Sequence, residues 1–417
     1  MRVLFLSNFY PPASRGGYEE WCQEVAEGLR SRGHDIVVLT SQNGRSTLAP
    51  SDPSWLYRDL FLEMEIASLR NSVQFFTSRK AHENQNLAIL QQYVEDFEPD
   101  VILIWGMWNL PRSLPARAEE LLPGRVVYYM GDYWPTLPSQ WQNYWQVSPR
   151  NWVTAVPKLL LKPMANYLLR KEKRPSLKLE QVIFPTTFLQ DEFVRQGIEP
   201  EQSTIIYGAI DTGLYENGHH PNKAKAGLVN LLYIGRLAPE KGVHTAIEAL
   251  GILAREKEYN QLKLTIVGTG EPDYEAQLRA LADQQQLRSM VEFSGAQPKE
   301  AIPGLYHSAD ILLFTSIWPE PFGRVPVEAM AAGVAVIGTA VGGAAEVMED
   351  NFNALLFTPG DAQSLAGQIA RLIASPELKE TLLANGRHTA REKFDIQRMS
   401  SEIETYLQQT ADRLKQS

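Results

Sequence analysis

The chain has 417 residues, 44% hydrophobic and 21% charged, with a formal net charge of −9 and one cysteine, Cys22. This composition excludes a wholly disordered, collagen-like or coiled-coil protein, and the negative charge argues against a nucleic-acid partner. One cysteine can form neither an internal disulfide nor a structural zinc site. With no apolar run of about 20 residues and no signal-peptide pattern, the sequence predicts a cytoplasmic protein of about two to three domains.

The first half of the chain alternates short apolar runs with amphipathic segments. After a predicted strand at 3–7, Trp21, Val25 and Leu29 recur every four residues and predict a helix. Gly33 ends this helix, and a strand follows at 36–39. Further strands are predicted at 101–105, 126–130, 182–185 and 204–207.

The same rhythm restarts in the second half, with a strand at 231–234 and a helix from about Val243. Four more strands are predicted at 264–267, 291–294, 311–315 and 334–337. Because continuous apolar strands alternate with helices, each half should form a parallel sheet covered on both faces. We therefore predict an α/β fold of two doubly wound domains, at 1–210 and 228–390, joined by a polar linker near 217–222. The remaining segment, 391–417, is predicted to be a helix packing on the first domain.

Residues 134–180 interrupt this alternation with a group of aromatic residues and basic charge. Between positions 150 and 180 there are eight basic and two acidic residues, and the aromatic residues are Trp134, Trp141, Tyr144, Trp145 and Trp152. Such a composition suits a membrane interface or an anionic acceptor. The alternative is a solvated insertion whose aromatic residues pack on their own domain.

Several common catalytic signatures are absent from the sequence. There is no phosphate-binding loop of the NTPase type, no His-Glu-x-x-His, no Cys-x-x-Cys and no Gly-x-Ser-x-Gly. No Asp-x-Asp occurs either, so we expect no metal–diphosphate site and no cofactor. Gly268-Thr269-Gly270 is followed by Asp273 where a dinucleotide fingerprint requires glycine, and His219-His220 reads as a surface pair.

Two loops favour a phosphorylated ligand. Arg15-Gly16-Gly17 lies between the first strand and the first helix, where glycine lets the backbone approach an anion at a helix N-terminus. Arg236 and Lys241 occupy the matching loop of the second half and could neutralise a diphosphate. The alternatives are a simple glycine turn and a solvated pair of cations.

A third motif contains two glutamates, Glu320 and Glu328, with seven residues between them. Pro319 and Pro321 keep Glu320 out of a helix, whereas Glu328 belongs to a helix predicted at 325–332. The N-terminus of that helix, near Gly323, offers free N–H groups to a phosphate. Carboxylates accept hydrogen bonds from vicinal hydroxyls, so the two glutamates suit a sugar and a ribose on either side of a diphosphate.

With these motifs in this order, nearly the whole chain resembles the retaining family-4 glycosyltransferases of the GT-B fold. The motifs that carry the likeness are Tyr10-Pro11-Pro12, Gly16-Gly17, Gly33-His34-Asp35, Gly235-Arg236, Lys241-Gly242, Val267 to Gly270, Glu320 to Glu328, Ala329 to Gly333, and Gly342-Gly343 with Glu346. The resemblance implies two Rossmann-like domains facing a central cleft. It also implies metal-independent, retaining transfer of a hexosyl group from a uridine or guanosine diphosphate sugar to a glycan, lipid-linked or small-molecule acceptor.

The resemblance also implies a role for each matching residue. Arg236 and Lys241 would hold the donor diphosphate, with the backbone of Gly16 and Gly17 closing on it. Glu320 would bind donor-sugar hydroxyls, oriented by the amides of Phe322 and Gly323, and Glu328 would bind the ribose. The remaining donor contacts would come from Gly268, Gln297, Arg324 and Val325. Apart from the resemblance, the basic and aromatic composition of 150–180 predicts peripheral contact with the inner face of a membrane.

Two departures from the family pattern leave alternatives open. Many members have a histidine directly before Asp132, where this chain has Gly131. Either Asp132 acts near the sugar or acceptor, or it is a loop or helix-cap aspartate. The usual Asn-Gly before the interdomain aspartate is also missing, and the segment reads Gly208-Ala209-Ile210-Asp211. A nucleotide-sugar-binding protein without transfer activity and a sugar-nucleotide epimerase are therefore alternative functions.

Overall fold

The structure is a computed structural model that describes residues 1–14, 16–43, 52–66, 70–148, 152–216, 228–256, 259 and 261–413, with the backbone alone at 152–154 and 157. Arg15, the His219-His220 pair and the predicted linker at 217–222 lie outside the described residues, as does the side chain of Trp152.

The chain folds into two units. The first contains residues 1–185, 190–206 and 400–417, and the second contains 186–189 and 207–399. Residues 391–399 therefore belong to the second unit, not to a separate terminal segment. The last helix, α15 (Ile396–Arg413), begins in the second unit. In the first unit, its Glu404 accepts hydrogen bonds from Arg32 at 2.8 Å and His34 at 2.6 Å.

Seven parallel strands form the sheet of the first unit, in the order β3-β2-β1-β4-β5-β6-β7. The strands are β1 (Arg2–Leu6), β2 (Asp35–Ser41), β3 (Leu56–Leu60), β4 (Val101–Ile104), β5 (Val126–Tyr129), β6 (Gln181–Phe184) and β7 (Gln202–Ile205). The helices of this part of the chain are α1 (Gly17–Ser31), α2 (Asn71–Thr77), α3 (Arg79–Phe97), α4 (Ser113–Leu121), α5 (Gln140–Gln146), α6 (Trp152–Lys171) and α7 (Thr187–Arg195). The strand order reverses between β1 and β4, which places a ligand-binding switch point at their carboxyl ends.

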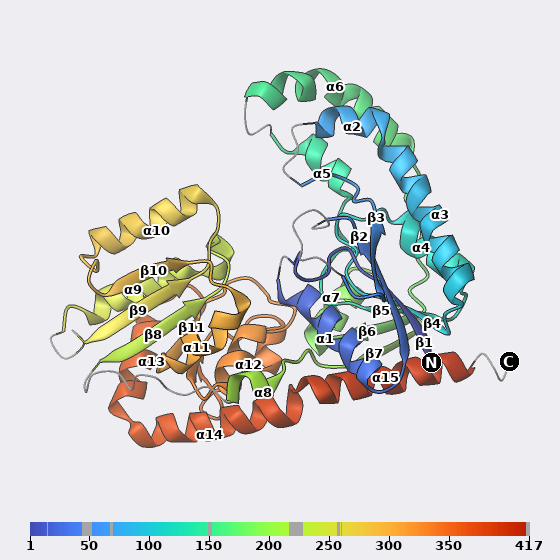
Figure 1. Ribbon diagram of the computed structural model, residues 1–417. Helices are drawn as coiled ribbons and strands as arrows, with labels where there is room; N and C mark the ends of the chain where they lie inside the picture. Colours follow the sequence, from blue (N-terminus) through green and yellow to red (C-terminus); the bar gives the residue numbers. More distant parts are fainter. Residues whose placement is uncertain are drawn as a thin grey trace. The chain divides into compact units, whose positions relative to one another are not determined.

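The second unit repeats this plan with six parallel strands in the order β10-β9-β8-β11-β12-β13. They are β8 (Val229–Ile234), β9 (Leu262–Val267), β10 (Val291–Gly295), β11 (Ile311–Phe314), β12 (Ala335–Gly338) and β13 (Leu355–Leu356). The α-helices are α8 (Thr212–Glu216), α9 (Val243–Leu253), α10 (Pro272–Gln284), α11 (Ile302–His307), α12 (Arg324–Ala331), α13 (Ala362–Ala374) and α14 (Pro376–Lys393). The switch point of this sheet lies between β8 and β11 (Figure 1).

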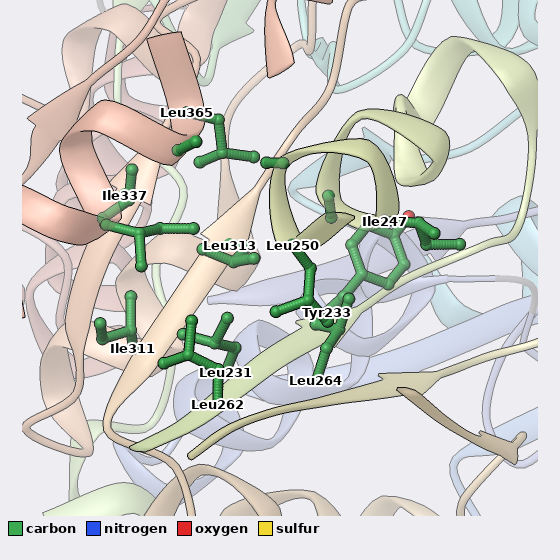
Figure 2. Close-up of a cluster of buried hydrophobic side chains, with 14 of the residues drawn as sticks. Leu231, Tyr233, Ile247, Leu250, Leu262, Leu264, Ile311, Leu313, Ile337 and Leu365 are labelled. Carbon is green, nitrogen blue, oxygen red and sulfur yellow. The ribbon is translucent and has the colours of Figure 1, made fainter. Parts of the chain in front are cut away.

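Alternate strand residues build the core of the second unit. Leu231 of β8, Leu264 of β9 and Leu313 of β11 are at most 1% exposed and point to one face of the sheet (Figure 2). Leu250 of α9 and Leu365 of α13 cover that face and are fully buried. The prediction of an α/β fold with two parallel, helix-covered sheets is confirmed.

Candidate functional site

The switch point of the second unit brings together two loops that are about 75 residues apart in sequence. Because Ile311 of β11 pairs with Leu231 of β8, the segments that follow these strands leave the same edge of the sheet. The loop after β8 ends in a short 3₁₀ helix, Pro239–Lys241, and the loop after β11 carries Glu320.

Backbone contacts hold these two loops against each other. The amides of Ile317 and Trp318 donate to the carbonyl of Glu240 at 3.0 and 3.2 Å, and Thr315 Oγ1 donates to the carbonyl of Lys241 at 2.8 Å. Gly242 follows with φ +64°, and a Cβ there would lie 2.1 Å from the carbonyl oxygen of Thr315. Only glycine fits this position, which explains Lys241-Gly242 in the sequence.

Lys241 and Glu320 meet at this junction. Lys241 Nζ lies 2.5 Å from Glu320 Oε1, and Ser316 Oγ donates to the same oxygen at 2.6 Å. The Lys241 and Glu320 side chains are 25% and 14% exposed, so the pair is shielded but reachable. Within the described part of the chain, Oε2 of Glu320 accepts no hydrogen bond. That oxygen can therefore receive a ligand hydroxyl.

Arg236, the other predicted cation, points elsewhere. Its side chain is 65% exposed and donates to Glu240 at 2.7 Å. The structure thus brings Lys241 to Glu320 and leaves Arg236 on the rim, where its predicted contact with a diphosphate stays a prediction.

The backbone around Glu320 is fixed from a third loop. Gly343 N donates to the carbonyl of Glu320 at 2.6 Å, and the preceding Gly342 has φ +66°. Phe322 is 3% exposed and packs edge-on against Phe394 at 5.5 Å between ring centroids. Gly323 is the N-cap of α12, so the amides of Phe322 and Gly323 immediately precede the helix, as the motif predicts.

Glu328 is a buried carboxylate on α12, 7% exposed. Arg324 Nε donates to its Oε1 and Tyr306 Oη donates to its Oε2, both at 2.9 Å. Burial, and then the negative charge of Glu328, raise the pKa of Tyr306 well above its ordinary value. A carboxylate accepts about four hydrogen bonds, so two donors leave capacity for a ribose diol. The hydroxyl of Tyr306 also lies 3.4 Å from the carbonyl oxygen of Val325.

Gly268 and Gln297 have structural roles beside this site. Gly268 has φ +131°, and a Cβ there would lie 1.9 Å from the carbonyl oxygen of Gly235. Its amide donates to the carbonyl of Gly295 at 2.9 Å, and Gln297 Nε2 donates to that of Ser294 at 2.7 Å. Both residues therefore shape the loops after β8, β9 and β10, and their contact with a donor stays a prediction.

In the first unit, the amide of Gly16, the N-cap of α1, is already engaged. Gly16 N donates to Glu19 Oε2 at 3.0 Å, and Glu19 is 7% exposed. One N–H group that was assigned to an anionic ligand therefore has a carboxylate partner within the chain. A glutamate three residues after an N-cap is the signal of this arrangement, and sequence reasoning overlooked it.

The Gly131-Asp132 departure has a steric cause. A Cβ on Gly131 would lie 2.3 Å from Cε2 of Tyr18, whose hydroxyl accepts a hydrogen bond from Gly131 N at 3.1 Å. The Tyr18 ring thus occupies the space that a histidine side chain would need. Asp132 is partly buried. Desolvation raises the pKa of Asp132 to about 7, and the negative charge of Glu19 acts in the same direction. A hydrogen bond from Trp134 N opposes this shift.

The first unit also contains a cavity of about 170 Å³ beside the segments that follow β3, β4 and β5. Burial raises the pKa of Glu63 to about 7, and the charge of Glu83 adds to the shift. A hydrogen bond from Gln140 N, at 3.0 Å, lowers the pKa and opposes the shift. Trp134 and Trp141 also line the cavity, and their indole N–H groups have no partner among the described residues.

The sequence flagged the two tryptophans of this cavity but gave no signal for Glu63 or Glu83. Much of the remaining lining comes from the 134–180 segment that interrupts the α/β rhythm. Burial, and then the charge of Arg174, lower the pKa of Arg112 to about 10; its guanidinium donates to the carbonyls of Pro135 and Pro175.

Within the described ranges, no cluster of three or more His, Cys, Asp or Glu side chains could hold a metal ion. No described helix combines the length and the hydropathy that a membrane span requires.

Comparison with known proteins places both halves of the chain among sugar-transferring enzymes. Residues 15–214 match the profile described as Glycosyltransferase Family 4, and residues 218–389 match Glycosyl transferases group 1. An uncharacterized glycosyltransferase of Methanocaldococcus jannaschii is 32% identical over 173 residues, which is 41% of this chain and 43% of that protein. The matched region thus spans less than half of that relative.

Two further proteins are similar over nearly the whole chain. Glycogen synthase of Mycobacterium tuberculosis is 24% identical over 413 residues, or 96% of this chain and 93% of the enzyme. The crystal structure of Anabaena HepE in complex with UDP and glucose has a TM-score of 0.68 at 23% identity, covering 98% of this chain and 99% of that one.

Proposed function

This chain belongs to the group 1 glycosyltransferases of the GT-B fold, and from that premise we propose that it transfers a hexosyl group from a nucleoside-diphosphate sugar to a hydroxylated acceptor. The family resemblance is thereby confirmed. The donor, the retention of anomeric configuration and the independence from metal are parts of the proposal.

The observation that carries the donor assignment is the pair of Lys241 and Glu320 at the switch point of the second sheet. The ammonium of Lys241 is partly shielded from solvent and paired with a carboxylate, and it can exchange that partner for a phosphate oxygen. The exchange frees the carboxylate for sugar hydroxyls at the same moment. HepE, which shares the fold, contains UDP in its crystal structure, and this supports a nucleotide donor.

The remaining donor contacts follow from the chain's own geometry. Gly323 is the N-cap of α12, and a helix N-terminus favours a phosphate, so the first amides of this helix would bind the donor diphosphate. Glu328, four residues into that helix, would bind the ribose diol while Arg324 keeps its carboxylate oriented. Stabilisation of the departing diphosphate by Lys241 and these amides would be the largest catalytic contribution.

We assign the acceptor to the first unit. The cavity beside β3, β4 and β5 offers carboxylates at Glu63 and Glu83, and indole N–H groups at Trp134 and Trp141 that have no partner among the described residues. Such groups accept from and donate to hydroxyls, which suits a sugar or another polyol. Asp132, with its raised pKa, would take the acceptor proton when it is ionised.

The proposal is tested by incubating the purified chain in EDTA with UDP- and GDP-hexoses and a panel of sugar and polyol acceptors, and following nucleoside-diphosphate release and the glycosylated product by NMR. Transfer with the donor's anomeric configuration supports it. Binding without release favours a binding protein, and a free epimerised nucleotide sugar favours an epimerase. Activity that appears only when a divalent ion is restored contradicts the metal-independent assignment.

A further inference from the structure

Helix α6 (Trp152–Lys171) buries one face in a satellite apolar cluster. Ala165 is fully buried there, and Leu161, Leu168 and Leu169 pack beside it. The cluster also contains aromatic side chains from α2 and α5, namely Phe75, Trp141 and Trp145. This face satisfies the usual requirement that an amphipathic helix cover its apolar stripe.

The opposite face of α6 is apolar as well, but nothing in the described part of the chain covers it. Its large apolar side chains are all more than half exposed: Val156 59%, Leu159 63%, Leu160 75%, Met164 54% and Tyr167 56%. Their spacing of three and four residues places them on one stripe over three turns. In Figure 1, α6 lies next to α2 and α5, which pack against its buried side. A contiguous exposed apolar stripe of this kind marks an interaction surface.

Positive charge lies at the end of that stripe. Arg170 and Lys171 form the last turn of α6, and Lys173 follows it, all three exposed. Lys171 Nζ lies 4.5 Å above the ring of Tyr167. Residues 152–171 contain no Asp or Glu, although the chain as a whole has a net charge of −9.

We propose that this face of α6 docks on an anionic lipid bilayer surface. The leucines, Val156 and Met164 would enter the boundary between headgroups and acyl chains. Tyr167 would sit at headgroup level, with Arg170 and Lys171 on lipid phosphates. A second copy of the chain would bring the same uncompensated positive charge to the contact, so charge complementarity favours lipid over self-association.

The test is sedimentation of the full chain with vesicles of phosphatidylcholine alone or with a third phosphatidylglycerol. We expect binding to the anionic vesicles that weakens as salt rises. Leu159→Ser/Leu160→Ser should lower the partition coefficient by about tenfold per leucine, because each loses a buried apolar side chain. Val194→Ser/Leu214→Ser, at side chains 44% and 54% exposed on other helices, is the matched control and should bind like the parent.

The charge arm uses Arg170→Gln/Lys171→Gln, which should weaken binding to anionic vesicles by about fivefold per residue and leave the small binding to neutral vesicles unchanged. Lys178→Gln/Arg195→Gln is its control. Thermal melting without vesicles shows whether each variant is folded. No binding to anionic vesicles at low salt, or equal binding by the leucine variant, overturns the proposal. So does a dimer in light scattering that the leucine variant dissociates without any change in vesicle binding, since the face would then be a self-association surface.

Discussion

Lys241 Nζ and Glu320 Oε1 lie 2.5 Å apart at the carboxyl edge of the second sheet, although the two residues are 79 positions apart in the chain. The pair depends on two backbone clamps, one through Glu240 and one through Gly343. The pair joins the cation proposed to bind the donor diphosphate and the carboxylate proposed to bind the donor sugar. Each of these groups has its charge satisfied before a ligand arrives, so a donor phosphate must displace Glu320 from Lys241, whereas Oε2 of Glu320 can receive a sugar hydroxyl directly.

The first prediction separates the roles of the pair. Glu320→Gln should lower the turnover number by about 10²-fold or more, because the sugar loses a hydrogen-bond acceptor in the transition state. Its affinity for the nucleoside diphosphate should be equal to or above that of the parent, because Lys241 is released. Calorimetric titration and steady-state kinetics give both values. Glu240→Gln is the control in the same loop, and parallel losses in turnover and affinity for Glu320→Gln would contradict the assignment.

Lys241→Met should show the opposite pattern. Loss of an ammonium from a phosphate contact should weaken nucleoside-diphosphate binding by about 1.5–3 kcal/mol, the contribution of a hydrogen bond to a charged group. Calorimetry with the diphosphate and with the parent nucleoside measures this directly. The nucleoside, which lacks phosphate, should bind both proteins equally, and an equal loss for both ligands would place Lys241 away from the diphosphate.

Glu328 can be tested against its own hydrogen-bond donor. Glu328→Ala should weaken nucleotide binding by about 1.5–3 kcal/mol and also destabilise the fold, since Arg324 Nε and Tyr306 Oη each lose a hydrogen-bond acceptor in a buried place. Tyr306→Phe removes one donor and keeps the carboxylate. It should cost about 1 kcal/mol of stability with nucleotide affinity nearly unchanged. If Tyr306→Phe reduces affinity as much as Glu328→Ala, the ribose contact is wrong and Glu328 is structural.

Gly131 should tolerate no side chain while Tyr18 is present. Gly131→Ala forces a contact of 2.3 Å with the Tyr18 ring and should lower the free energy of unfolding by about 1–3 kcal/mol. Gly367→Ala, in α13 where a Cβ would meet nothing within 4 Å, should stabilise the protein by about 0.5–1 kcal/mol. In urea unfolding, Tyr18→Ala should abolish the penalty of Gly131→Ala. An additive double variant would reject the steric account of the missing histidine.

The raised pKa of Asp132 predicts a pH dependence with a definite sign. Between the ordinary pKa of an aspartate and about 7, the unfolded chain has released a proton that the folded chain keeps. This group therefore destabilises the fold increasingly as pH rises, up to about pH 7. The melting temperature of Asp132→Asn should be higher than that of the parent at pH 8 and equal to it at pH 4. If Asp132 acts as the base, kcat/KM of the parent should rise with pH through about pH 7. This rise should be absent from the pH profile of the variant. If the rise in kcat/KM persists in Asp132→Asn, it must come from the titration of another group.

Most of the sheet could be predicted because buried parallel strands are continuous apolar runs, as in Val101–Ile104 and Ile311–Phe314. The edge strand β3 (Leu56–Leu60) was missed because its centre is Arg58. This arginine is 3% exposed, and its guanidinium donates to the carbonyls of Tyr10 and Pro11 and to Asp52. The two-residue strand β13 is too short to give a pattern.

The candidate site shows a similar division. The spacing of the glutamates and glycines in the second unit is enough to predict their site from the sequence alone. The pairing of Lys241 with Glu320 depends on tertiary contacts, whereas the capture of Gly16 N by Glu19 is local and has a sequence signal. Glu63 has no local signal at all, because its role follows from burial beside a cavity formed by distant segments.

The most direct test of the donor assignment is the melting temperature of the parent and Lys241→Met proteins in EDTA with UDP, GDP, ADP, CDP and their hexose conjugates. We predict that the diphosphates of one base stabilise the parent, by about 2.7 kcal/mol at 100 times the dissociation constant, and that Lys241→Met largely loses this gain. If no nucleotide shifts the parent, or if both proteins shift equally, the Lys241–Glu320 junction is not a nucleotide-sugar site.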